Sequence, residues 1–216
     1  MGFKEKTLEL AEILKDYPNC KVVIATKLFT PEQVEELYNL GYRDFGENRV
    51  EMFLEKYHHL ENYKDIRWHF FGNLQTRKVR EIASHLHCLH SLDSETTAYE
   101  LDKRLNKELD CYVQVNISEE KNKCGVPYLQ VKNFIRRIAN YPKIRIIGLM
   151  CIGTMTPNED ILEDEFSRMK ELQEEIQDLG LAYAPCTELS MGMSNDFKIA
   201  LKEGATCIRL GRYFLR

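Results

Sequence analysis

Short apolar runs alternate with longer amphipathic stretches along almost the whole chain. The first apolar run covers residues 21–27 and is rich in β-branched residues, which is typical of a buried strand. Thr30 and Pro31 then open a stretch with helical periodicity, and Gln33 completes a capping box at its start. The same alternation of strand and helix continues toward the C-terminus and predicts a parallel sheet.

We expect one domain over residues 1–216, with eight strands that are each followed by a helix except the last. This number of units favours an α/β fold of the (β/α)8 barrel (TIM barrel) type. A doubly wound sheet is the alternative, and it fits less well because no glycine-rich dinucleotide loop follows the first strand. The predicted strands cover residues 21–27, 42–46, 67–73, 88–93, 111–117, 144–151, 188–193 and 207–211.

An additional helix is predicted before the first strand, over residues 3–17. The predicted barrel lacks an eighth helix after its last strand. We therefore expect the N-terminal helix either to cover the bottom of the barrel or to pack beside the last strand, where that helix is missing.

Composition and charge exclude several classes of protein. Hydrophobic residues make up 44% and charged residues 30% of the chain, as in ordinary globular proteins. The formal net charge is −4 and no basic segment stands out, so nucleic-acid binding has little support. No apolar run is long enough to span a membrane and the N-terminus lacks the apolar core of a signal peptide, so we expect a cytoplasmic protein.

The seven cysteines show no C-x-x-C pairing and are expected to be reduced and mostly buried. His85, His87 and His90 surround Cys88, but this spacing fits no usual zinc site. We therefore expect no metal.

Lys27 is the most unusual residue of the first predicted strand. Lys27 ends this strand, shares a face with Val23 and Ala25, and stands at the carboxyl end, where such barrels carry their active sites. Partial removal from water there would disfavour the ammonium form and leave more free amine, the form that attacks a carbonyl. Taken alone, Lys27 is more simply explained as a strand end that reaches solvent.

The same rule selects residues after the other strands. Arg209 lies on the last strand, beside the first in a closed barrel, and a neighbouring cation would further favour the free amine of Lys27. The segment Ser190–Ser194 leads into a helix, and with Gly211 it forms a candidate phosphate site. Together these residues suit a ligand that has a phosphate, a carbonyl for the lysine and an acceptor for the arginine. Pyridoxal 5′-phosphate (PLP) has all three. The rule also selects Asn48, His69, Asn73, Asn116 and Met150.

Several segments, in chain order, resemble the pyridoxal phosphate homeostasis proteins, which are single-domain relatives of the alanine racemase barrel. Together they cover nearly the whole chain. The segments are Val23–Lys27, Phe45–Asn48, Trp68–Gln75, Val113–Ile117 with Lys123–Gly125, Arg145–Met150, Leu189–Ser194 and Ile208–Gly211.

The resemblance implies a barrel of the alanine racemase N-terminal type with PLP as its cofactor. It implies that Lys27 holds PLP as a Schiff base, the internal aldimine, and that Arg209 faces the pyridine nitrogen. Asn48, His69 and Met150 would line the pocket.

The resemblance also implies that Ser190, Ser194 and the backbone around Gly211 and Arg212 hold the phosphate. The family usually continues after this glycine with a small hydroxyl residue and an Ile-Phe-Gly segment. Here the chain continues with residues 212–216, Arg-Tyr-Phe-Leu-Arg, so Arg212 either adds a phosphate contact or disturbs the site.

The function implied is PLP (vitamin B6) homeostasis: storage, buffering or delivery of PLP to PLP-dependent apo-enzymes, with effects on amino- and keto-acid metabolism. We expect a monomer. We also expect little catalytic turnover, because an arginine at the ring nitrogen weakens the electron sink. A weak PLP-dependent amino-acid racemase is the alternative, and Tyr42, Tyr112 and Tyr213 are its candidate acids. A barrel that binds another phosphorylated metabolite is a third possibility. Lys78 and Lys123 are candidates for transient PLP attachment.

Overall fold

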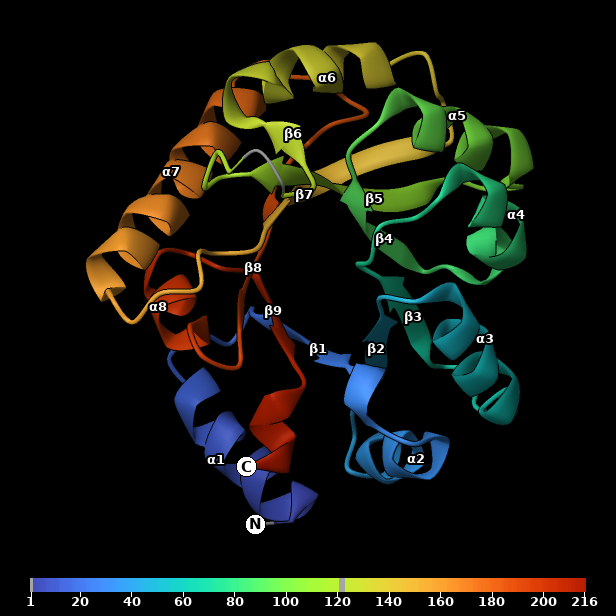
Figure 1. Ribbon diagram of the computed structural model, residues 1–216, viewed down its shortest axis with the longest axis vertical. Coiled ribbons are helices and arrows are strands. Elements are labelled where there is room, and N and C mark those ends of the chain that lie inside the picture. The colour runs from blue at the N-terminus through green and yellow to red at the C-terminus, as the bar shows by residue number, and fades with distance from the viewer. Residues whose placement is uncertain (1, 121–122) are drawn as a thin grey trace.

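Parallel strands close into a barrel in the computed structural model, which describes residues 2–120 and 123–216 (Figure 1). The barrel strands are β1 (Lys21–Ala25), β2 (Asp44–Glu47), β3 (Arg67–Phe70), β4 (Cys88–Leu92), β5 (Leu109–Asn116), β7 (Ile144–Cys151), β8 (Glu188–Met193) and β9 (Cys207–Leu210). Their order is β4-β3-β2-β1-β9-β8-β7-β5, and a pairing between β4 and β5 closes the ring. The short strand β6 (Val126–Pro127) pairs with β5 outside this ring. The predicted (β/α)8 barrel is therefore confirmed.

Helices form an outer layer around the strands (Figure 1). Thr30 and Gln33 make the predicted capping box at the start of the second helix. The α-helices are α1 (Phe3–Leu14), α2 (Pro31–Asn39), α3 (Val50–His59), α4 (Val79–Ile82), α5 (Glu95–Arg104), α6 (Val131–Ile138), α7 (Glu159–Gln177) and α8 (Phe197–Lys202). Short 3₁₀ helices are η1 (Thr26–Leu28), η2 (Thr76–Lys78), η3 (Ala83–His85), η4 (Tyr128–Gln130) and η5 (Arg212–Leu215).

Helix α1 occupies the place where an eighth barrel helix is missing. In Figure 1 it lies between α2 and α8, beside the C-terminal η5. The Tyr213 hydroxyl donates to the carbonyl oxygen of Lys6 at 3.5 Å, and the Lys6 ammonium lies 5.1 Å from the centre of the Tyr213 ring. Of the two predicted placements of this helix, packing beside the last strand is the one observed.

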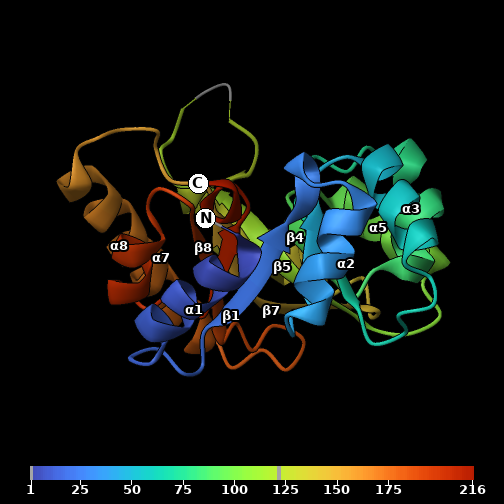
Figure 2. The same cartoon turned by 90° about the horizontal axis from the view of Figure 1, so that it is seen from below.

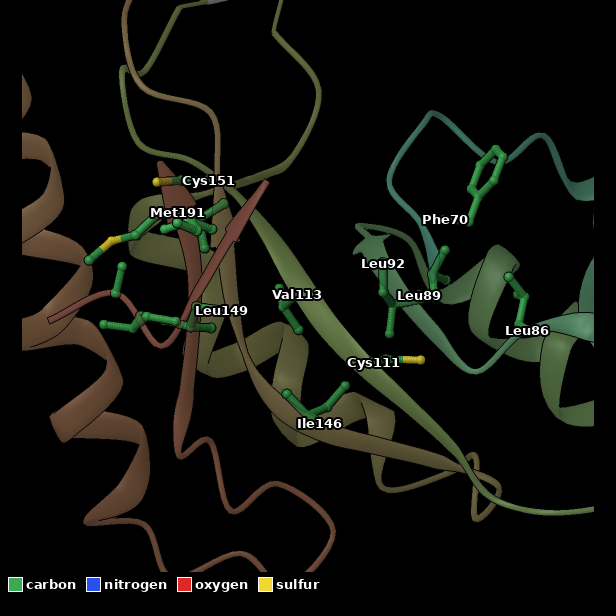
Figure 3. Close-up of a cluster of buried hydrophobic side chains, with 14 of the residues drawn as sticks. Phe70, Leu86, Leu89, Leu92, Cys111, Val113, Ile146, Leu149, Cys151 and Met191 are labelled. Atoms are coloured by element: carbon green, nitrogen blue, oxygen red, sulfur yellow. The ribbon is translucent and has the colours of Figure 1, made fainter. Parts of the chain in front are cut away.

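Strand side chains alternate between two apolar clusters, one between strands and helices and one inside the barrel. The outer cluster includes Cys111, Val113 and Leu149, which Figure 3 shows among other buried side chains. Tyr112 and Met150 belong to the separate inner cluster, together with Cys88 and Ile147.

Strand β1 ends at Ala25, two residues earlier than predicted, and Thr26–Leu28 turn into η1. The buried Thr26 hydroxyl makes hydrogen bonds to Gly46 O (3.1 Å) and Glu47 Oε1 (2.7 Å), which fix the turn against β2. Lys27 therefore lies on η1 and not on the strand, so the predicted shared face with Val23 and Ala25 is wrong.

The connections that follow β5 and β7 rise from the same end of the barrel (Figure 2). The loop predicted over residues 118–125 includes residues 121 and 122, which lie outside the described residues. None of the helices in the described ranges combines the length and the apolar character that a membrane crossing requires. All seven cysteines are free thiols; Cys88, Cys111, Cys151, Cys186 and Cys207 are buried, Cys20 is partly buried and Cys124 is exposed.

Candidate functional site

A cavity of about 170 Å³ lies at the carboxyl end of the barrel strands. Side chains from the ends of β1, β2, β7, β8 and β9 meet there, as expected for this fold. Phe71 and Gly72, which follow β3, complete its wall and were not predicted as site residues. Of the predicted site residues, Lys27, Asn48, Met150, Ser194, Arg209, Gly211 and Arg212 line this cavity.

Lys27 reaches the cavity from η1, and its side chain is exposed. The predicted removal of this amine from water is therefore not present in the structure. Strands β1 and β9 are neighbours as expected, but Arg209 pairs in register with Val23, so it sits deeper in the barrel than Lys27.

A fully buried ion pair supports the turn that carries Lys27. The Lys56 ammonium lies 2.5 Å from Glu47 Oε1, and neither side chain is accessible to solvent. Glu47 also accepts hydrogen bonds from the Thr26 hydroxyl and from the backbone N–H of Asn48 (3.2 Å). This pair was not predicted from the sequence. Its signal there is Lys56, three residues after the buried Phe53 on the apolar side of α3.

The ends of β8 and β9 form a corner rich in backbone N–H groups. The Ser194 hydroxyl oxygen accepts from the N–H of Gly211 (3.4 Å) and from the N–H of Tyr213 (3.0 Å). A side chain at position 211 would bring a Cβ within 2.7 Å of the Ala25 carbonyl oxygen, so the approach of the two strand ends requires glycine.

The helix after β8 begins at Phe197, later than predicted, so Ser194 is not its cap. Asp196 lies before it, and Oδ1 of this carboxylate accepts from the N–H of Met193 at 2.5 Å. Burial raises the pKa of the Asp196 carboxyl group. The corner predicted to hold a phosphate is thus built from strand ends and η5 and not from a helix N-terminus.

Ser190 and His69 are buried in the barrel and are not among the residues that line the cavity. The Ser190 hydroxyl lies 2.7 Å from Nη1 of Arg209 and 2.9 Å from Nδ1 of His90. The resemblance implied that Ser190 holds a phosphate and that His69 lines the pocket. In the structure neither residue lines the cavity.

Arg209 is held below the cavity by the walls of the barrel. It donates from Nη1 to the Ser190 carbonyl oxygen (2.7 Å) and from Nη2 to the Cys151 carbonyl oxygen (2.8 Å). The side chain is buried, and this burial lowers the pKa of the guanidinium group. Nε and the second N–H of Nη2 make no hydrogen bond to the residues that the structure describes, and Arg209 is among the residues that line the cavity.

The three tyrosines considered for racemase chemistry do not line the cavity. Tyr112 is buried in the barrel and donates to Glu188. Tyr213 faces α1, and Tyr42 packs edge-to-face on Phe214, with ring centres 5.5 Å apart.

The two additional lysines are placed differently. Lys78 pairs with Glu51 and does not line the cavity. Lys123 pairs with Glu120 at 2.7 Å and lines an adjoining hollow of about 320 Å³, which shares Phe71 with the cavity.

The chain is similar along its length to proteins of one family. Residues 5–215 match the alanine racemase N-terminal domain family. Over 197 residues the chain is 38% identical to the pyridoxal phosphate homeostasis protein of Aquifex aeolicus, which covers 89% of this chain and 85% of that protein. The chain belongs to the pyridoxal phosphate homeostasis protein family. The protein of that name from Helicobacter pylori strain J99 is 34% identical over 91% of this chain and 87% of its own length.

Solved structures agree with this family assignment. The structure of PipY from Synechococcus elongatus with PLP bound has a TM-score of 0.90 at 28% identity, over 99% of this chain and 100% of that one. PipY without PLP gives a TM-score of 0.92 at 29% identity, with the same coverage of both chains. Alanine racemase from Corynebacterium glutamicum shares the fold, with a TM-score of 0.72 at 14% identity over 59% of that chain.

Proposed function

We propose that this protein binds PLP in the cavity at the carboxyl end of the barrel and serves PLP homeostasis. The observation that carries the proposal is the meeting of three features around one cavity: the Lys27 amine, the Arg209 guanidinium and the N–H-rich corner of Ser194 and Gly211. An aldehyde, a ring nitrogen and a phosphate would each find a suitable partner there.

In this proposal Lys27 condenses with the aldehyde of PLP to form a Schiff base, and one water molecule leaves. The phosphate takes hydrogen bonds at the corner of Ser194 and Gly211, where Arg212 adds a positive charge. Arg209, which can only donate, faces the ring nitrogen as an acceptor and disfavours its protonation. Bound PLP would supply an electron sink, which this arginine makes weak.

Reduction with borohydride followed by peptide mapping tests the attachment. The protein is incubated with PLP, reduced, digested and analysed by mass spectrometry. We expect the reduced pyridoxyl group on the peptide that contains Lys27. A label found on Lys78 or Lys123 instead, or no label, would contradict the proposal.

We further propose that the protein carries PLP and does not turn over amino acids efficiently. Racemisation needs an acid or base on each face of the substrate. In the described part of the chain, the titratable groups that line the cavity are Lys27, Arg209 and Arg212, and arginine is a poor proton donor at neutral pH. Exchange of amino-acid α-hydrogens in D2O, followed by proton NMR, should not exceed that caused by free PLP. Exchange that Lys27→Ala abolishes would support the racemase instead.

Delivery to PLP-dependent apo-enzymes is the part of the proposal that concerns partners. The exposed Lys27 side chain supports it, because an attacking amine can reach a Schiff base at this position. We expect the PLP-loaded protein to restore activity to a PLP-dependent apo-enzyme, and restoration no faster than from the free PLP it releases would contradict direct delivery. The monomeric state and the cytoplasmic location stay predictions.

A further inference from the structure

A chain of polar side chains, buried except for the partly exposed Asp44, crosses the barrel from the cavity to the opposite end. It starts at Arg209, whose Nη1 donates to the Ser190 hydroxyl oxygen at 2.7 Å. The Ser190 hydroxyl lies 2.9 Å from His90 Nδ1, and His90 Nε2 lies 2.8 Å from His69 Nδ1. The chain ends where His69 Nε2 meets Asp44 Oδ1 at 2.9 Å.

The Arg209 end of the chain favours one direction for every hydrogen bond. A guanidinium group can only donate, so the Ser190 oxygen accepts from Arg209 and its own proton is free to point at His90. His90 Nδ1 then accepts, and in a neutral ring Nε2 carries the proton and donates to His69.

The Asp44 end independently gives the same direction. Burial alone would raise the pKa of Asp44, but hydrogen bonds from Arg67 and His69 hold it well below its ordinary value. The ionised carboxylate can only accept, so His69 Nε2 must carry a proton. If His69 is neutral, its Nδ1 accepts from His90. Both ends therefore agree on one pattern, in which each group donates to the next from the Arg209 cation to the Asp44 anion.

The opposite pattern would place a further cation inside the barrel. It requires protonation of both nitrogens of His69 while His90 donates from Nδ1 to Ser190. Burial lowers the pKa of His90 well below its ordinary value, so His90 itself stays neutral. A buried imidazolium at His69 would add a charge to an interior that already holds Arg209.

We propose that Asp44 is the counter-charge of Arg209 and acts on it through His69, His90 and Ser190. These four are positioning residues: the aligned hydrogen bonds hold the guanidinium in its place below the cavity and stabilise its charge. The effect on the ligand rests on the proposed PLP function, whereas the chain of hydrogen bonds does not depend on that function.

The same histidines raise the question of a metal centre. Ligand atoms of His69, Cys88 and His90 all lie within 4.8 Å of one another. However, one nitrogen of each ring faces the other ring at 2.8 Å, and the second nitrogen of each is bound by Asp44 or Ser190. Burial also raises the pKa of the Cys88 thiol, which opposes the thiolate that a metal needs. The geometry thus favours a hydrogen-bonded chain.

Nitrogen-15 NMR of the histidine rings, without PLP, tests the chain directly. We expect His69 and His90 to be neutral at pH 7.5, with the proton on Nε2 in both rings. Variants His69→Gln and His90→Gln assign the two signals. A proton on Nδ1 of His90, or an imidazolium at His69, would overturn the proposed direction. A change of both ring signals with one equivalent of zinc, lost in Cys88→Ser, would overturn it in favour of a metal centre.

A second experiment tests the effect on the cavity. We expect Asp44→Asn and Ser190→Ala to weaken PLP binding about threefold to tenfold, since each breaks the chain without altering a residue that lines the cavity. Asp110→Asn is the matched control, because it removes another strand carboxylate, 3.5 Å from Arg145 and outside the chain. Equal affinities in all three variants would overturn the positioning role. If the unaltered protein bound no PLP, the proposed function would be wrong. The NMR result would still show whether the hydrogen bonds between Arg209 and Asp44 have the proposed direction.

Discussion

Arg209 is a buried cation whose described hydrogen bonds all go to neutral oxygens. A charge in such a place needs compensation, because desolvation of an ion costs several kcal/mol. The barrel provides it through carbonyl groups of β7 and β8 and through the Ser190 hydroxyl. At the scale of the residue, the cavity floor is therefore defined by a fixed donor that cannot lose its proton at physiological pH.

His90 makes the stability of the protein dependent on pH. Its folded-state pKa is lowered by burial, whereas in the unfolded chain it is about 6.5. Below that value the unfolded state binds more protons, so the free energy of unfolding falls as the pH drops. We expect His90 to account for a loss of about 1 kcal/mol between pH 7.5 and pH 5.5, measured by urea unfolding.

The difference between the free energies of unfolding at pH 7.5 and pH 5.5, measured in two histidine variants, identifies the residue responsible. His90→Gln should reduce this pH-dependent loss, whatever its effect at pH 7.5. His59→Gln, which changes an exposed histidine, should leave the loss as in the unaltered protein. An identical pH dependence in the unaltered protein and His90→Gln would contradict this account.

At the scale of the element, α1 replaces a barrel helix although it comes first in the chain. Leu10 is 1% exposed and belongs to the main core, whereas Leu8 on the same helix is 65% exposed. We expect Leu10→Ala to lower the free energy of unfolding by about 2–4 kcal/mol because it leaves a cavity, and Leu8→Ala to change it by less than about 0.5 kcal/mol. Urea unfolding measures both, and similar small effects would show that α1 adds little to the barrel.

The turn η1 and the end of β2 are joined by the Glu47 carboxylate. Glu47→Gln leaves Lys56 buried without its counter-charge, so we expect a loss of about 3–5 kcal/mol of unfolding free energy. The exposed pair Lys132–Glu175 provides the control, and Glu175→Gln should cost less than about 1 kcal/mol. Denaturant titrations measure the free energy of unfolding of both variants. A loss below about 1 kcal/mol for Glu47→Gln would mean that the Glu47–Lys56 pair does not fix the turn.

At the scale of the whole molecule, the sequence was sufficient to predict the barrel and most of the cavity wall. The reason is physical: the carboxyl ends of parallel strands in a barrel meet at one end, so residues after successive strands come together. Lys27, Asn48 and Gly211 were predicted in this way, although they lie far apart in the chain.

The same rule fails where the alternation of a strand is interrupted. The register between β8 and β9 shifts between Ser190 and Met193, and Gly192 has a φ of +90°. Ser190 lies in the interior while Ser194 lies at the mouth, because Ser194 stands four residues further along a strand that rises about 3.3 Å per residue. A local pattern of residues contains no sign of such a shift.

The interior chain could not be predicted for a different reason. His69 and His90 are 21 residues apart, and His90 and Ser190 are 100 residues apart. Only the closed ring of strands brings these side chains together. His90 lies close to His85 and His87 in the sequence, whereas the histidine that it meets in the structure is His69.

The visible absorption spectrum shows whether Lys27 holds PLP. PLP is added to the unaltered protein, to Lys27→Ala and to Lys78→Ala, and excess PLP is removed. We expect a Schiff-base band to remain in the unaltered protein and in Lys78→Ala and to be absent from Lys27→Ala. The same spectrum in the unaltered protein and Lys27→Ala would contradict the claim that Lys27 holds the cofactor.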